Sequence, residues 1–415
     1  MVLLYNAGIS FLKLVYGIAA RFNPKAKLFL EGRRQQVEAL KKKFPHPSSE
    51  KWVWVHCASL GEFEQGRPVI ESLKSWNPSV KILLTFFSPS GYEVRKNYES
   101  ADAVFYLPWD TSSNAKWFVE NVQPALAIFV KYEFWYHYTA ALYKRSIPLI
   151  SISSIFRSDQ TFFRPYGSLF RKMLGYFNHF FVQNEESVRL LQSVGLTNVT
   201  LCGDTRFDRV SQVIQQAGEI PVAHRFKDDQ KLMVVGSAWQ DDMEVLYPFI
   251  NENNGRLKFI IAPHEITEEF ISSIEKSVEA KCIRFSNTEG ARLQDASVLI
   301  IDNIGMLSRL YRYGEFAFIG GGYGDGLHNI LEAACYGIPV FFGNKRYQKF
   351  QEAVDLVLRG GAFDVADFTE LKSKYELMST HPETFLLACE VTKQYVKEHL
   401  GATARIVDYS KKFLI

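Results

Sequence analysis

The stretch Trp52-Val-Trp-Val-His-Cys-Ala-Ser-Leu-Gly-Glu62 decides the fold. It begins with an apolar run of strand length, Trp52–His56, which is followed by a turn of small residues and a helical stretch from about Glu64. Similar strand-like runs follow, with helical or loop-like segments between them: Lys81–Phe87, Ala103–Leu107, Ala125–Val130, Pro148–Ile152, His179–Val182 and Val199–Leu201. This alternation predicts a parallel sheet covered by helices.

The alternation stops near Gln212–Asp229, a polar stretch, and then restarts. The later strand-like runs are Leu232–Val235, Leu257–Ala262, Val298–Ile301, Phe316–Ile319 and Pro339–Phe342. We therefore expect an α/β protein with two Rossmann-like domains, residues 46–215 and 225–395, and a ligand cleft between them outside the carboxyl ends of the strands. Residues 396–415 read as a C-terminal helix that could cross back to the first domain.

Length and composition agree with a folded two-domain chain. The 415 residues suit two domains at ~150 residues each, and 47% hydrophobic with 22% charged residues excludes disorder, collagen and coiled coil. A net charge of +3 gives no reason to expect a nucleic-acid partner. The five cysteines are widely spaced without a CxxC pair, which favours reduced thiols in a cytosolic chain. Neither HExxH nor GxxxxGK[ST] occurs, which disfavours the zincin and P-loop classes.

Residues 1–45 are predicted to contact a membrane. The first 20 residues carry one charge, Lys13, and on a helix Asn6, Ser10, Lys13, Gly17 and Arg21 form one narrow polar stripe. Eight Lys and Arg residues follow within residues 21–43, and basic residues beside an apolar helix favour an anionic cytoplasmic leaflet. The alternative is an amphipathic helix packed on its own domain, with solvated lysines.

Glu62 is the first candidate catalytic residue. It follows the first strand of the core, beside a helix start, and Gly61 lets the backbone approach a ligand closely. A carboxylate at the mouth of a cleft can act as a general base when burial raises its pKa. The alternative is a Glu that the helix dipole favours in a first turn.

Two further candidate groups follow later strands. Lys131 and Glu133 share a face if their strand continues, and the alternative is a solvated strand end with an aromatic plug. Arg206, in Gly203-Asp-Thr-Arg-Phe-Asp208, could clamp a carboxylate or phosphate. A structural pair of this arginine with Asp204 or Asp208 is equally compatible with the spacing.

The richest motif is the glycine-rich stretch Gly320–Glu332, in which a strand enters a loop and a helix begins near Asn329. Exposed amides at such a helix start bind phosphate oxygens, and Glu332 can accept hydrogen bonds from ribose hydroxyls. The loops Gly236–Trp239, Ala262–Glu265 and Asp302–Leu307 each follow a strand-like run, so we expect them to converge on one nucleotide. A glycine loop without a ligand is the alternative.

In this order, these loops resemble the motifs of the Kdo (3-deoxy-D-manno-octulosonic acid) transferases of lipopolysaccharide synthesis. The motifs that carry the resemblance are Ser59-Leu-Gly-Glu62, Gly203-Asp-Thr-Arg-Phe-Asp208, Pro263-His264, Asp302-Asn-Ile-Gly-Met-Leu307 and Gly326-Leu-His-Asn-Ile-Leu-Glu332. Where the family usually has Glu-Thr-Glu-Leu-Trp-Pro, this chain has Lys131-Tyr-Glu-Phe-Trp-Tyr136. Lys131 cannot accept a proton, but it could bind the Kdo carboxylate or a lipid phosphate.

The resemblance implies a GT-B fold and an inverting, metal-independent transfer of Kdo from CMP-Kdo to the lipid A precursor lipid IVA. It implies that Glu62 is the general base and that CMP-Kdo is a donor substrate, with no separate cofactor. The residues expected to hold CMP are Pro263, His264, Ile304, Gly305, Met306, Asn329, Ile330, Leu331 and Glu332. With the basic N-terminal segment, it implies location on the cytoplasmic face of the inner membrane.

Two other functions remain compatible with the sequence. One is a GT-B enzyme that uses a UDP-sugar, and the other is a membrane-associated nucleotide-binding protein without catalysis. Thermal stabilisation of the protein by CMP well above UDP would favour a Kdo transferase over the enzyme that uses a UDP-sugar. A large loss of turnover on replacing Glu62 would favour an enzyme over the protein without catalysis.

Overall fold

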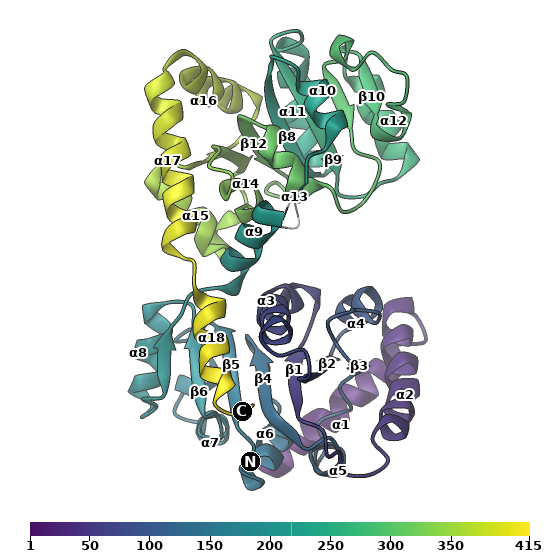
Figure 1. Cartoon of the computed structure of the whole chain (residues 1–415), viewed down its shortest axis with the longest axis vertical. Helices are drawn as coiled ribbons and strands as arrows, with labels where there is room; N and C mark the ends of the chain where they lie inside the picture. Colours follow the sequence, from purple (N-terminus) through teal and green to yellow (C-terminus); the bar gives the residue numbers. More distant parts are fainter. Residues whose placement is uncertain (217, 325) are drawn as a thin grey trace. The chain divides into compact units, whose positions relative to one another are not determined.

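The computed structural model describes residues 1–216, 218–324 and 326–415. The chain divides into two compact units, of which unit 1 comprises Met1–Arg209 with Leu400–Ile415, and unit 2 comprises Val210–His399 (Figure 1). The C-terminal segment thus belongs to the same unit as the N-terminus.

Unit 1 is built on a seven-stranded parallel sheet in the order β3-β2-β1-β4-β5-β6-β7. Its strands are β1 (Trp52–Cys57), β2 (Lys81–Phe86), β3 (Ala103–Tyr106), β4 (Pro124–Val130), β5 (Leu149–Ser154), β6 (His179–Val182) and β7 (Val199–Leu201). Its helices are α1 (Val2–Ala19), α2 (Pro24–Lys43), α3 (Leu60–Trp76), α4 (Pro89–Arg95), α5 (Ser112–Val122), α6 (Tyr136–Lys144), α7 (Ser168–Leu174), α8 (Glu185–Ser193), α18 (Ala402–Lys411) and the start of α9 (Thr205–Gln216).

Both faces of this sheet are covered, which is why its strands are continuous apolar runs. Along β1, Val53 and Val55 join a core cluster with residues of α3 and α18, whereas Trp52 and Trp54 join a second cluster with residues of α5 and α6. Asp208 fixes the start of α18, because its carboxylate accepts hydrogen bonds from the amides of Gly401 (2.7 Å) and Thr403 (2.6 Å).

Unit 2 repeats this architecture with a second seven-stranded parallel sheet, in the order β10-β11-β9-β8-β12-β13-β14. Its strands are β8 (Lys231–Ala238), β9 (Leu257–Pro263), β10 (Cys282–Arg284), β11 (Val298–Ile300), β12 (Phe316–Ile319), β13 (Val340–Gly343) and β14 (Ala362–Val365). Its helices are α10 (Pro221–Lys227), α11 (Gln240–Glu252), α12 (Glu268–Ser277), α13 (Leu307–Leu310), α14 (Leu331–Ala334), α15 (Gln351–Arg359), α16 (Phe368–Thr380) and α17 (Pro382–Glu398). Two Rossmann-like units are therefore confirmed, although the sequence analysis missed β10 and β14.

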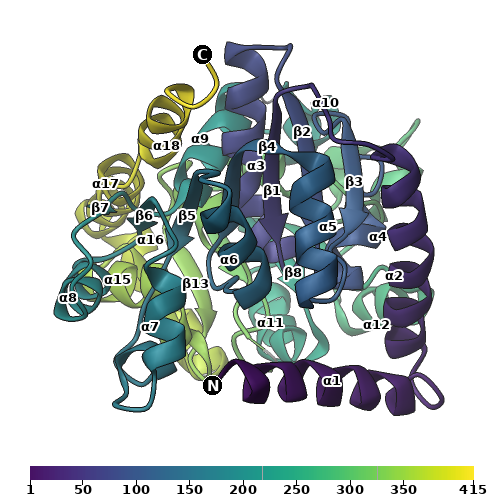
Figure 2. The same ribbon diagram turned by 90° about the horizontal axis from the view of Figure 1, so that it is seen from below.

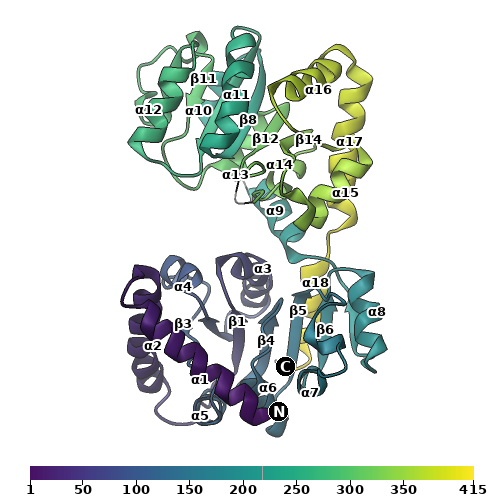
Figure 3. The same ribbon diagram turned by 180° about the vertical axis from the view of Figure 1, so that it is seen from behind.

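Helix α1 runs along one side of unit 1, from α6 to α2 (Figures 2 and 3). Its inward face contacts the unit along most of its length: Tyr5 donates to Asp110 (2.5 Å), Asn6 bonds His137 (2.6 Å), Lys13 lies over Trp109, and Tyr16 stacks on Phe29. Asn6 and Lys13, two members of the predicted polar stripe, therefore face the protein. The opposite face exposes Leu3, Leu4, Phe11, Leu14, Val15 and Ile18. Among the described residues, α1 alone meets the length and composition of a membrane-crossing helix.

Arg33 corrects part of the charge prediction for residues 21–43. Its side chain is buried and donates to the carbonyl oxygens of Leu107 (2.9 Å) and Phe87 (2.7 Å), so it cannot face a lipid leaflet. Its guanidinium also lies 4.0 Å from the ring centroid of Phe29. Burial lowers the pKa of Arg33 to about 10, and its role is to fasten α2 to the loops after β2 and β3.

Candidate active site

The candidate catalytic residues of unit 1 lie where its strand order reverses. Strand β1 pairs with β2 on one side and β4 on the other, and the loops after β1 and β4 leave the same edge of the sheet. Ligands of open α/β sheets bind in the crevice at this position. The loop after β1 leads to Glu62, and the loop after β4 carries Lys131 and Glu133.

Glu62 stands in the first turn of α3 and is partly buried. Its carboxylate accepts a hydrogen bond from the amide of Ala58, on the loop that leaves β1. Burial and, next, the Glu133 carboxylate raise the pKa of Glu62 to about 7, against the opposing effects of the Ala58 amide and the Lys131 ammonium. A carboxylate of this pKa can accept a proton efficiently near neutral pH.

Glu133 is held in a buried network. It accepts hydrogen bonds from Trp135 Nε1 (2.6 Å) and makes one with His56 Nε2 (2.9 Å), while His56 Nδ1 lies 2.9 Å from Thr85 Oγ1. The side chain of Glu133 is 10% exposed. Glu133 is thus fixed beside Glu62 as a charged neighbour, and the predicted solvated strand end is wrong for this residue.

Lys131 does not share a strand face with Glu133, because β4 ends at Val130. The backbone of Lys131 has φ 64°, in the left-handed region that a residue with a side chain adopts at a cost. Its ammonium lies 5.4 Å from the ring centroid of Tyr132 and acts electrostatically on Glu62. The turn at Lys131 therefore ends the extended backbone on which the shared strand face was predicted.

Arg206 lies in the first turn of α9 and pairs with Asp204 at 2.9 Å. Asp204 also accepts from Gln65 Nε2 (2.8 Å), so the pair ties α9 to α3. This is one of the two structural pairs predicted for Arg206. The other predicted partner, Asp208, instead bonds the start of α18.

Three rings stack at the corresponding position of unit 2. Trp239 follows β8, His264 follows β9 and His328 lies in the loop after β12, so three of the predicted loops do converge. The ring centroids of Trp239 and His264 are 4.2 Å apart, and those of His264 and His328 are 4.5 Å apart. Trp239 Nε1 donates to His328 Nε2 (2.9 Å), which places the proton of a neutral His328 imidazole on Nδ1. Burial, followed by His264, lowers the pKa of His328 to about 4.

The glycine-rich loop is shaped mainly by its own packing. A Cβ on Gly320 would lie 2.1 Å from the carbonyl oxygen of Ser237, so no larger residue fits there. The amide of Gly321 donates to the buried Asp242, and the amides of Gly324, Gly326 and His328 donate to carbonyls of the same loop. The amides at these four positions are therefore already hydrogen-bonded within the protein. Asp325 lies outside the described residues.

The remaining residues expected to hold CMP occupy different environments. Ile304 is 92% exposed, so its loop lies at the surface of unit 2. In the same loop, Gly305 has φ 97° and Met306 precedes α13. In contrast, Ile330 and Leu331 are buried. The side-chain oxygen of Asn329 accepts a hydrogen bond from the Leu331 amide (3.2 Å), just before α14, and its amide group donates to Glu332 (3.2 Å). Pro263 is the last, buried residue of β9.

Sequence reasoning missed two residues that shape these sites. His56 was read only as the end of a strand, although a buried polar side chain in an apolar run is a signal for a fixed partner. Asp242 accepts from the amides of Trp239 (2.9 Å) and Gly321 (2.8 Å) and so joins two loops; burial raises its pKa to about 6. An acid in the first turn of α11 was its only signal. In the described part of the chain, no three His, Cys, Asp or Glu side chains are grouped to hold a metal ion.

Comparison with known proteins gives matches over most of the chain. The family model described as 3-Deoxy-D-manno-octulosonic-acid transferase (kdotransferase) matches residues 31–209. A 3-deoxy-D-manno-octulosonic acid transferase of Aquifex aeolicus is 30% identical over 359 residues, which cover 84% of this chain and 93% of that protein. The protein of the same description from Chlamydophila psittaci is 24% identical over 407 residues, which cover 94% and 92% respectively.

Among solved structures, UDP-GlcNAc 2-epimerase from Neisseria meningitidis bound to UDP-GlcNAc has a TM-score of 0.62 to this chain. The match covers 87% of this chain and 100% of that one at 16% sequence identity, and so concerns the fold alone. It agrees with the two parallel sheets and confirms the predicted GT-B class.

Proposed function

The chain belongs to the 3-deoxy-D-manno-octulosonic acid (Kdo) transferase family, and from this premise we propose its donor, acceptor and catalytic base. As a member of the family it is a glycosyltransferase that transfers Kdo in lipopolysaccharide synthesis. The proposed donor is CMP-Kdo, and the proposed acceptor is a hydroxyl of the lipid A precursor, lipid IVA. No further cofactor and no metal are proposed.

In the proposed reaction, Glu62 removes the proton of the acceptor hydroxyl. The oxygen then forms a bond to the anomeric carbon of Kdo from the side opposite CMP, so the configuration inverts. The bond to the phosphate oxygen breaks, and CMP leaves with the electron pair. The proton remains on Glu62 until it passes to solvent. The observation that carries this proposal is the position of Glu62 at the strand-order reversal, with its pKa raised to about 7.

Neighbouring residues would raise the proton affinity of the base, Glu62, and bind the donor, CMP-Kdo. Glu133, fixed by His56 and Trp135, keeps the proton affinity of Glu62 high. Lys131 would bind the Kdo carboxylate or a lipid phosphate. In unit 2, the stack of Trp239, His264 and His328 supports a nucleotide site, together with the surface loop Ile304–Met306 and the pair of Asn329 and Glu332.

We also propose that the enzyme works on the cytoplasmic face of the inner membrane. The exposed apolar side of α1 supports contact with an anionic lipid surface, where its lipid acceptor resides. Basic residues of α2 that remain exposed, among them Arg34 and Lys42, would add electrostatic attraction.

The decisive experiment is a turnover assay with CMP-Kdo generated in situ and lipid IVA, followed by mass analysis of the product. A mass increase of one or more Kdo residues is expected from the wild type. Glu62→Gln should abolish most turnover and still be stabilised by CMP. Equal thermal stabilisation by CMP and UDP, with no Kdo-containing product, would refute the proposed donor.

A further inference from the structure

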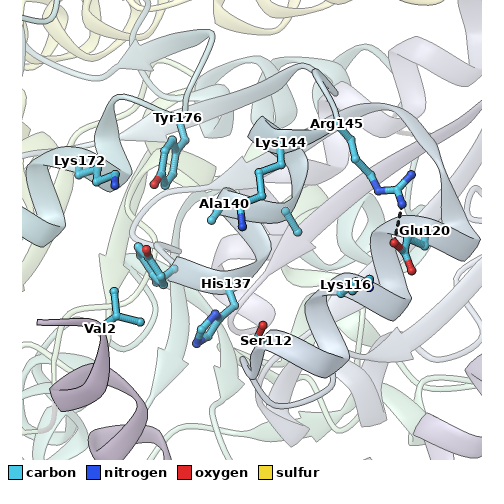
Figure 4. Close-up of a pocket in the computed structure, with 12 residues that line it drawn as sticks. Val2, Ser112, Lys116, Glu120, His137, Ala140, Lys144, Arg145, Lys172 and Tyr176 are labelled. Carbon is cyan, nitrogen blue, oxygen red and sulfur yellow. Dashed lines mark hydrogen bonds and ion pairs between the residues drawn. The ribbon is translucent and has the colours of Figure 1, made fainter.

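A pocket at the amino end of α1 is lined by lysine side chains without an acidic partner among the described residues. It has a volume of about 620 Å³ and lies in unit 1, where Lys116 of α5, Lys144 of α6 and Lys172 of α7 surround it (Figure 4). We call it the basic pocket. Val2 of α1 forms part of its wall, so the pocket borders directly on the apolar helix.

The three lysines are available for a ligand. Arg145, also at this pocket, is neutralised by Glu120 at 2.5 Å. In contrast, none of Lys116, Lys144 and Lys172 forms a salt bridge within the residues that the structure describes, and all three are exposed. Three ammonium groups from three separate helices around one hollow suit a phosphate group, whose oxygens accept hydrogen bonds from several directions.

The contacts of α1 determine how this helix can meet a membrane. They run from Tyr5 to Tyr16, about 16 Å along the helix axis at 1.5 Å per residue, and hold α1 flat against its own unit. Tyr5 is bonded to the Asp110 carboxylate, which also accepts from the amides of His137 and Tyr138 at the start of α6. A helix that crossed the bilayer would have to break this row of contacts.

We propose that α1 lies in the plane of the leaflet and that the basic pocket binds the phosphate headgroup of an anionic phospholipid at its amino end. The exposed residues Leu3 and Leu4 directly follow Val2, so the pocket lies next to the residues that would enter the acyl boundary. Headgroup phosphates lie at that depth. This inference rests on the proposed function only in placing the enzyme at a membrane.

The pocket is tested with the full-length protein and vesicles of phosphatidylcholine, with or without phosphatidylglycerol. The variant K116A/K144A/K172A should lose about 100-fold in partition onto the anionic vesicles, at about fivefold for each lysine, and little on neutral ones. The matched control, K276A/K393A/K397A, removes the same charge from exposed positions of unit 2. An equal loss in both variants would overturn the assignment of the pocket.

The orientation of α1 is tested in cells with a protease-cleavable tag before Met1. An in-plane helix leaves the tag on the cytoplasmic side, so it should be cleaved in inverted membrane vesicles and protected in intact spheroplasts. Cleavage in spheroplasts with protection in inverted vesicles would show a spanning helix and overturn the in-plane arrangement.

A third measurement tests phospholipid binding at the basic pocket independently of the proposed Kdo transfer. Turnover of detergent-solubilised lipid IVA by K116A/K144A/K172A should stay within about twofold of wild type, because the phospholipid leaflet is absent. A loss of more than tenfold in detergent would assign the pocket to the acceptor and overturn the phospholipid assignment. If the wild type itself gives no Kdo-containing product, the proposed reaction fails, while the vesicle result still decides the pocket.

Discussion

Glu62 should make turnover rise with pH through neutrality. With a pKa of about 7, the carboxyl is about one-tenth ionised at pH 6 and about nine-tenths at pH 8, so kcat/KM should rise about tenfold. A glutamate with the ordinary pKa of 4.5 would already be almost fully ionised at pH 6, and the profile would be flat. The assay is CMP release from CMP-Kdo at low lipid IVA concentration. Glu62→Gln should be slower by about 10²–10⁴-fold and lose the pH dependence.

The variant Glu133→Gln tests whether the charge of Glu133 contributes to the raised pKa of Glu62. It removes the charge that helps to raise the pKa of Glu62 but keeps a side chain of the same size, so the rise in kcat/KM should move to lower pH. A wild-type profile that is flat between pH 6 and pH 8 would refute the reasoning. A profile that does not move in Glu133→Gln would refute the role of that neighbour.

The same raised pKa has a consequence for stability. A carboxyl whose pKa is higher in the folded than in the unfolded state destabilises the fold increasingly as pH rises from the unfolded to the folded value. With values of 4.5 and about 7, Glu62 costs on the order of 3 kcal/mol at pH 8 and about 1 kcal/mol at pH 5. Glu62→Gln should therefore raise the melting temperature of unit 1 more at pH 8 than at pH 5, as calorimetry can measure. An equal effect at both pH values would contradict the pKa.

Five further substitutions test other parts of the structure. Arg33→Ala leaves the buried carbonyl of Leu107 and the partly buried carbonyl of Phe87 without their donor and should cost about 2–4 kcal/mol in denaturant unfolding, whereas Arg34→Ala at an exposed neighbouring position should change stability by less than about 0.5 kcal/mol. Trp239→Phe keeps the ring stack but removes one hydrogen bond, so CMP affinity measured by calorimetry should fall about fivefold; an unchanged affinity would dissociate the stack from the nucleotide site. Gly320→Ala should unfold unit 2 in circular dichroism and melting experiments, whereas Gly61→Ala, where a Cβ meets only one atom at 4.0 Å, should fold normally and lose turnover; a fully active Gly61→Ala variant would contradict close ligand approach there.

The strands could be predicted because parallel strands buried on both faces are short apolar runs. Trp52–His56 and Phe316–Ile319 are examples in which sequence and structure agree within one residue. Strands β10 and β14 were missed because they lack this continuous apolar pattern. Cys282–Arg284 is only partly buried and Ala362–Val365 includes Asp364, so neither is a continuous apolar run.

Of the candidate site, the sequence supplied the positions of loops but not the directions of side chains. The coming together of Trp239 and His264 followed from two strands ending at one edge of a sheet. The shared strand face predicted for Lys131 and Glu133 was wrong, because a local sequence pattern does not show that the backbone at Lys131 enters the left-handed region. Contacts between distant segments, such as His56 with Glu133 or Arg33 with the carbonyl of Leu107, depend on the completed fold, so no local pattern identifies the partner.

The return of residues 400–415 to unit 1 governs the order in which the chain can fold during translation. Ala402, Ile406, Val407 and Leu414 belong to the core cluster of unit 1, yet the ribosome makes them only after the whole of unit 2. Unit 2, residues 210–399, is fully synthesised before unit 1 receives the helix that covers this face. A nascent chain therefore keeps an apolar face of unit 1 open until residues 400–415 have been made, and a chain that stops before residue 400 keeps it open permanently. Such products should be bound by chaperones and removed by proteases even though they retain every residue assigned to catalysis.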